Sequence, residues 1–102
     1  MTHRETINEI RKTVSKDDLL CQLAEECSEL AQAALKLRRA ITKTNPTPVT
    51  YNQALEDLME EAADVLLCLR VLPEVEENGY IIDIGIAEKA ERWLSRLQEV
   101  QV

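Results

Sequence analysis

Apolar residues recur every three or four positions through two long segments of this chain, and this spacing constrains the fold more than any other feature. The repeat matches the turn of an α-helix, so each segment is expected to bury one helical stripe. The predicted stripes are Leu20, Leu23, Cys27, Leu30, Ala34, Leu37 and Ile41, then Leu55, Leu58, Ala62, Val65, Leu66, Leu69 and Leu72.

Residues that favour helix ends bracket both segments. Ser15 is suited to cap a helix that stops before the Pro-containing stretch 45–48, and Thr50 with Gln53 forms a capping-box pattern for the next helix. Pro73 ends or kinks that helix. A short amphipathic helix is expected over residues 2–14, an irregular turn over 74–79 and a last helix over 84–100, while residues 80–82 stay unassigned. The last helix is expected to turn one apolar stripe inward, formed by Ile86, Ala90, Trp93, Leu94 and Leu97.

Composition supports a single all-helical domain spanning residues 1–102. The 102-residue chain has three aromatic residues, two glycines and three prolines, which leaves little turn chemistry for β-hairpins. Its length suits one hydrophobic core, and 45% of its residues are hydrophobic. We therefore expect four helices, with the two long ones antiparallel.

The charge balance limits the partners. Twelve Lys and Arg against 19 Asp and Glu give a net charge of −7, which would repel polymeric nucleic acid and an anionic membrane. A small phosphorylated substrate would approach only if a bound cation reversed the local sign. Three cysteines without a Cys-x-x-Cys pair, no signal-peptide pattern and no membrane-spanning run indicate a reduced, cytoplasmic protein.

Two acidic clusters interrupt the long helices, one at residues 25–29 and the other at 60–64. Each holds a pair of acids three residues apart, which places them on one helix face. Successive residues turn by about 100° around a helix axis, so Glu26 lies roughly 60° from the centre of the first apolar stripe and Glu61 roughly 80° from the centre of the second. Both offsets have the same rotational sense. On antiparallel helices that sense brings Glu26, Glu29, Glu61 and Asp64 together on one side.

An all-oxygen site of this kind suits Mg²⁺, Mn²⁺ or Ca²⁺ better than Zn²⁺. His3 is the sole histidine, so a ferritin-like di-iron site with two Glu-x-x-His motifs is excluded. A solvated acidic surface is the simpler alternative, and the convergence of the four acids argues against it.

The segments Glu25-Glu26-Cys27-Ser28-Glu29-Leu30 and Glu61-Ala62-Ala63-Asp64-Val65-Leu66 resemble the EExxE…ExxD signature of MazG-like, all-alpha NTP pyrophosphohydrolases. The resemblance covers about residues 19–72, with a longer spacing between the two motifs. It implies a four-helix MazG-like bundle that hydrolyses a (d)NTP to a nucleoside monophosphate and pyrophosphate, assembled as a homodimer or homotetramer.

The resemblance also implies roles for individual residues. Glu26, Glu29, Glu61 and Asp64 would hold Mg²⁺, for which Mn²⁺ is a possible substitute, and Glu25 would activate water if it turned inward or reached a neighbouring subunit. Lys89-x-x-Arg92 resembles the basic motif of the family's last helix and would bind phosphates.

Other interpretations remain open from the sequence. The chain could be a non-catalytic oligomerisation or interaction module, or a phosphatase or phosphodiesterase using the same metals. We expect Cys27 and Cys68 to be buried or half-buried. Trp93 is expected to be a core residue, with base stacking at a subunit boundary as the alternative. Arg96 is expected on the same flank of the last helix as Lys89 and Arg92, and it has either a phosphate-binding or a structural role. Lys36, Arg38 and Arg39 are interpreted as structural, because cations suit a helix C-terminus.

Overall fold

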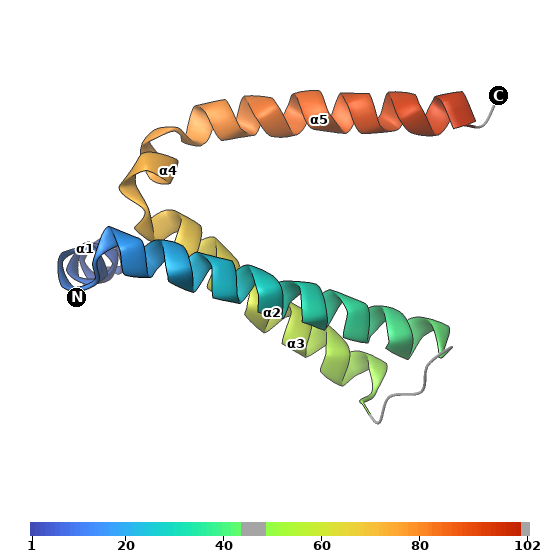
Figure 1. The fold of residues 1–102 in the computed structure, drawn as a ribbon, viewed down its shortest axis with the longest axis horizontal. Coiled ribbons are helices and arrows are strands. Elements are labelled where there is room, and N and C mark those ends of the chain that lie inside the picture. The colour runs from blue at the N-terminus through green and yellow to red at the C-terminus, as the bar shows by residue number, and fades with distance from the viewer. Residues whose placement is uncertain (44–48, 101–102) are drawn as a thin grey trace. The chain divides into compact units, whose positions relative to one another are not determined.

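The structure, a computed structural model, describes residues 1–43 and 49–100, and its regular elements are all helices. They are α1 (His3–Thr13), α2 (Lys16–Thr42), α3 (Tyr51–Val71), α4 (Pro73–Glu77) and α5 (Gly79–Val100) (Figure 1). The all-helical prediction is therefore confirmed, with five helices rather than four among the described residues.

Side-chain caps begin the two long helices where the sequence predicted. The Ser15 hydroxyl accepts a hydrogen bond from the Asp18 N–H at 3.2 Å, and the Thr50 hydroxyl accepts one from the Gln53 N–H at 3.2 Å. The second half of the predicted capping box does not form at Thr50. The Gln53 amide instead donates to Asp57 at 3.1 Å, one turn further along the same helix.

The helix ends also agree with the sequence. Lys43 caps α2 with a left-handed φ of 56°, and its N–H donates to the Arg39 carbonyl at 2.8 Å. The predicted breaker at Asn45–Pro48 lies outside the described residues. Helix α3 ends at Val71, and Leu72 caps it directly before Pro73.

The segment after Pro73 differs from the prediction. Residues expected to form an irregular turn make the short helix α4, and α5 begins at Gly79, five residues earlier than predicted. Proline suits the first position of a helix because it has no N–H to leave unpaired. The Asn78 side chain then donates to the Glu74 carbonyl at 2.6 Å, which supports the junction between the two helices.

The chain divides into two compact units, Met1–Leu72 and Pro73–Val102. In the second unit the predicted inward side chains of α5 are exposed, among them Ile86, Trp93, Leu94 and Leu97. The expectation that Trp93 is a core residue is therefore wrong for this unit by itself. The reason is that α4 is too short to cover the apolar stripe of a 22-residue helix.

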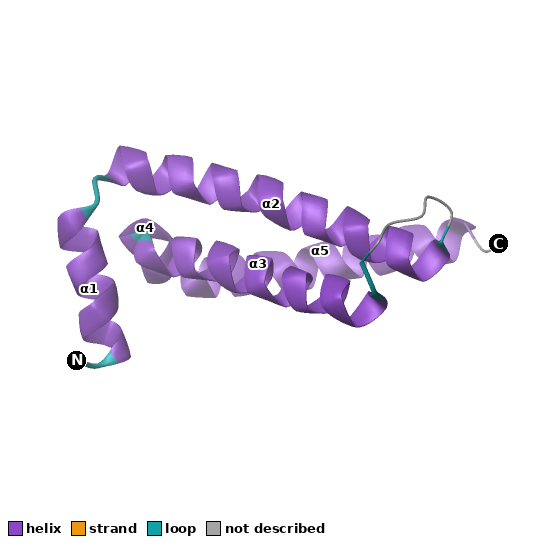
Figure 2. Cartoon of the chain, turned by 90° about the horizontal axis from the view of Figure 1, so that it is seen from below, coloured by secondary structure: helices purple, strands orange, loops and turns teal. Residues whose placement is uncertain are grey.

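In the first unit, α2 and α3 pack side by side and antiparallel (Figures 1 and 2). The residues of their seam alternate in steps of four and three, the spacing of a coiled coil. These buried and half-buried residues are Leu19, Leu23, Glu26, Leu30, Ala33, Leu37 and Ala40 on α2, and Ala54, Leu58, Glu61, Val65 and Cys68 on α3, followed by its cap Leu72.

This seam differs from the predicted α2 stripe. Leu23, Leu30 and Leu37 belong to both rows, but Leu20, Cys27, Ala34 and Ile41 are exposed. The predicted row is the more apolar of the two. In the structure α2 instead turns Glu26 and the small residues Ala33 and Ala40 toward α3, and it leaves its more apolar flank uncovered.

Helix α1 turns across one end of the α2/α3 pair (Figure 2). Ile7 on α1 is 3% exposed, and the Arg11 guanidinium donates to the carbonyls of Val71 at 3.0 Å and Arg70 at 2.7 Å. Arg11 thus satisfies carbonyls that the C-terminus of α3 leaves without helical partners. In the described part of the chain, no helix combines the length and apolarity required to cross a bilayer.

The neighbours Ala33 and Ala34 distinguish the observed seam from the predicted stripe. Ala33→Asn should lower the free energy of unfolding by about 1–3 kcal/mol more than Ala34→Asn, because only the first places an unsatisfied amide in the seam. Both substitutions carry the same helix-propensity cost, so urea denaturation followed by circular dichroism isolates burial. Equal losses, or a larger loss for Ala34→Asn, would contradict this packing.

Candidate metal centre

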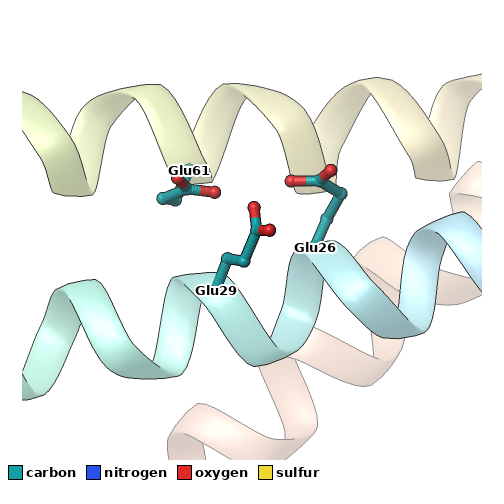
Figure 3. A group of neighbouring side chains, drawn as sticks. All are labelled: Glu26, Glu29 and Glu61. Carbon is teal, nitrogen blue, oxygen red and sulfur yellow. The ribbon is translucent and has the colours of Figure 1, made fainter.

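Three carboxylates meet where α2 faces α3. Glu26 and Glu29 extend from α2 and Glu61 from α3, and their side chains point toward one another (Figure 3). One oxygen from each lies within 4.8 Å of the other two. We refer to these three residues as the acidic cluster. They converge because Glu26 and Glu61 occupy the seam itself, with Glu29 one turn along on its flank.

Two oxygens of the acidic cluster are buried without a partner. Gln22 donates to Glu26 Oε1 at 2.8 Å, whereas Glu26 Oε2 and Glu61 Oε2 have no hydrogen-bond partner in the structure. No ion pair of Lys or Arg with a cluster residue is found within residues 1–43 and 49–100. A buried carboxylate oxygen without a donor is costly, and a cationic ligand at the cluster would offset that cost.

The electrostatic strain appears in the pKa of Glu26, which is raised above its ordinary value of 4.5. Burial is the largest cause, followed by the charge of Glu29 and by the hydrogen bond that a protonated carboxyl could donate between the two residues, and then by the charge of Asp64. The hydrogen bond from Gln22 acts in the opposite direction. Negative charge at Glu26 is thus disfavoured until a positive charge compensates it.

The oxygen set fits a hard divalent cation. Ligand oxygens lie about 2.1 Å from Mg²⁺, so two on opposite sides of the ion are about 4.2 Å apart. The three cluster oxygens are already within 4.8 Å of one another, and small side-chain rotations would close the remaining gap. Carboxylates alone, without nitrogen or sulfur, favour Mg²⁺ or Mn²⁺ over Zn²⁺.

The other predicted acids lie outside this group of three. Asp64 is exposed on the same flank of α3, and its charge acts on Glu26 although it is not one of the three converging carboxylates. Glu25 is exposed on α2. With the seam running through Glu26, Glu25 turns about 100° from it, toward the flank that carries Glu29. It faces that flank rather than the centre of the cluster.

Two cavities meet at the acidic cluster. A polar groove of about 470 Å³ is lined by Glu29, Gln32, Ala33, Leu35, Lys36, Arg39, Asp57 and Glu61. An apolar pocket of about 290 Å³ is lined by Ile10, Val14, Asp18, Leu19, Gln22, Glu26, Asp64, Leu67, Cys68 and Val71. Helix α1, held by Arg11, forms one wall of the apolar pocket.

Sequence reasoning missed Lys36 and Arg39 as residues of this region and assigned both to the helix dipole. Both are half-buried and line the polar groove, whereas Arg38 between them is exposed and does not. A signal was available in the spacing, because Lys36 follows Glu29 by seven residues, which is two helical turns on one face.

The predicted phosphate-binding residues lie in the other unit. Lys89, Arg92 and Arg96 line a small hollow of about 230 Å³ on α5 together with Trp93. The prediction that they share one flank of the last helix is confirmed. Their use in a common site with the acids stays a prediction.

Cys68 is half-buried, as expected, and burial raises the pKa of its thiol, followed in effect by the charges of Glu26, Asp64 and Cys27. Cys27 itself is exposed, so its prediction as a core residue is wrong. Comparisons with protein-family models, with curated proteins and with solved structures found no match to this chain.

The raised pKa of Glu26 predicts a pH dependence of stability. The folded protein binds a proton on the Glu26 carboxylate more tightly than the unfolded chain does, and this difference stabilises the fold. The stabilisation is fully present below pH 4.5 and is lost as the pH rises through the raised pKa of Glu26. In EDTA, the melting temperature of Glu26→Gln should therefore fall less steeply above that pH than that of wild type. Glu25→Gln, an exposed control one residue away, should keep the wild-type slope; parallel profiles for all three would contradict the assignment.

Proposed function

We propose that this protein is a Mg²⁺-dependent nucleoside-triphosphate pyrophosphohydrolase with a MazG-like four-helix arrangement. The observation that carries the proposal is the acidic cluster, in which three carboxylates converge and two of their buried oxygens lack partners. The resemblance of residues 25–30 and 61–66 to the EExxE…ExxD signature points to the reaction. Mn²⁺ is a possible substitute for Mg²⁺.

Glu26, Glu29 and Glu61 would hold the metal, with Asp64 completing the ligand set after a side-chain rotation. A bound Mg²⁺ would neutralise triphosphate charge and acidify a coordinated water. The water oxygen forms a bond to the α-phosphorus while the bond from that phosphorus to the bridging oxygen breaks. Pyrophosphate leaves with the electron pair, and the water proton passes to a carboxylate, for which Glu25 is the candidate on the Glu29 flank.

Lys89 and Arg92 are proposed to bind substrate phosphates, and a cytoplasmic location would supply the nucleotide. We further propose a homodimer or homotetramer. In support, α2 and α3 both expose apolar residues: Leu20 is 49% exposed, Met59 62% and Leu66 56%. These exposed residues give a second copy a surface to cover.

The second candidate is a non-catalytic interaction module, which the same exposed apolar residues favour. The two functions differ in their use of metal. An interaction module has no need for two unpartnered carboxylate oxygens in the helix seam, whereas a metal-dependent hydrolase does.

Metal binding should stabilise the fold. At a free Mg²⁺ concentration ten times the dissociation constant, linkage contributes about 1.4 kcal/mol. This is worth a rise of roughly 5–10 °C in the melting temperature of a domain this small. Glu61→Gln should remove most of the rise, whereas Glu60→Gln, an exposed neighbour on α3, should preserve it. An unchanged melting curve at millimolar Mg²⁺ would count against the metal site.

The reaction products separate this function from its rivals. Wild type with Mg²⁺ should release pyrophosphate and a nucleoside monophosphate from at least one standard or modified (d)NTP. Glu61→Gln should reduce turnover on the order of a hundredfold, because it removes a metal ligand. Orthophosphate as the first product would indicate phosphatase chemistry instead, and no product from a broad nucleotide panel would favour the interaction module.

A further inference from the structure

The polar groove places two cations beside the acidic cluster. Lys36 and Arg39 line it together with Glu29, Glu61 and Asp57. Both cationic residues are half-buried, although they lie in the last turns of a helix where long side chains usually extend into water. The groove therefore holds both cations and carboxylates, but neither Lys36 nor Arg39 forms an ion pair with a residue of the acidic cluster.

These cations are weakly engaged by the protein. Lys36 has one ion pair, to Asp57 at 3.7 Å, and its side chain is 37% exposed. A pair this long contributes little to stability. For the Arg39 side chain, no hydrogen bond or ion pair is found in the part of the chain that the structure describes. Its guanidinium therefore has donors available for a planar arrangement of anionic oxygens.

The net charge of the groove depends on metal. Three carboxylates (Glu29, Asp57 and Glu61) outnumber the two cations, which leaves a formal charge of −1. Glu26, the third carboxylate of the acidic cluster, lowers this sum to −2, and one divalent ion on the cluster raises it to 0. The groove therefore repels an anion until the metal has bound, and Lys36 and Arg39 can then attract one. The apolar pocket on the other side of the cluster has no Lys or Arg in its lining, so it offers no comparable attraction.

We propose that Lys36 and Arg39 bind the pyrophosphate end of the substrate, the β- and γ-phosphates, and then the pyrophosphate product. This inference rests on the proposed function. When the bond between the α-phosphorus and its bridging oxygen breaks, the electron pair stays on that oxygen and the leaving group gains negative charge. Lys36 and Arg39 stand where they can compensate it. The groove and the apolar pocket then orient the nucleotide, with its most anionic end toward α2's C-terminal half.

The inference is tested by titrating inorganic pyrophosphate into the protein in excess Mg²⁺ and following the heat of binding. Lys36→Gln and Arg39→Gln should each weaken pyrophosphate binding about tenfold, the usual loss for one charge-assisted hydrogen bond. Lys36→Arg should retain most of the affinity. Arg38→Gln is the matched control, because Arg38 lies on the same helix but outside the groove.

A second titration with a nucleoside monophosphate distinguishes a subsite from a general loss of structure. Its affinity should change less than twofold in every variant if the two cations hold only the pyrophosphate end. Equal weakening of both ligands, or unchanged pyrophosphate binding in Lys36→Gln and Arg39→Gln, would overturn the proposal.

The two proposals fail in different ways. If wild type releases pyrophosphate from a nucleotide but the groove variants bind pyrophosphate normally, this subsite is wrong and the pyrophosphohydrolase function stands. If wild type binds pyrophosphate through Lys36 and Arg39 but hydrolyses no nucleotide, the subsite stands and the reaction is wrong.

Discussion

The packing of two carboxylates into the seam between α2 and α3 is the constraint on which the site depends. Glu26 and Glu61 take positions that the four-three spacing of the seam would normally give to apolar residues. Each leaves one buried oxygen unpartnered, and burial together with the charge of Glu29 raises the pKa of Glu26. The two buried carboxylates lower the free energy of unfolding of the metal-free protein, and a divalent cation at the cluster would raise it again.

Burying these acids also determines what surrounds them. Because the seam runs through Glu26 and Glu61, the flank that carries Glu29 and Asp64 forms the walls of the two cavities. Lys36 and Arg39 continue that flank on one side, and α1, held by Arg11, closes the apolar pocket on the other. The cluster therefore lies between a cavity that carries cations and a cavity that is mainly apolar, which suits an elongated substrate charged at one end.

Much of this arrangement follows from local sequence signals. The caps at Ser15 and Thr50, the end of α3 before Pro73 and the convergence of Glu26, Glu29 and Glu61 were all predicted and found. The buried row of α2 nevertheless differs from the predicted one, because α2 carries two candidate apolar rows that share Leu23, Leu30 and Leu37. Hydrophobicity favours the row with Cys27 and Ala34, and helix α4 was missed because five residues show too little periodicity to identify.

The sequence by itself determined that this chain is helical, where its long helices begin and end, and that Glu26, Glu29 and Glu61 converge on one side of them. These properties follow from spacing and capping, which act within a few residues. Only the tertiary structure decided which row of α2 meets α3, and with it the burial of Glu26 and Glu61 and the entry of Lys36 and Arg39 into the groove. Which row of α2 faces α3 depends on how the side chains of the two helices pack together, and the periodicity of one helix alone does not determine it.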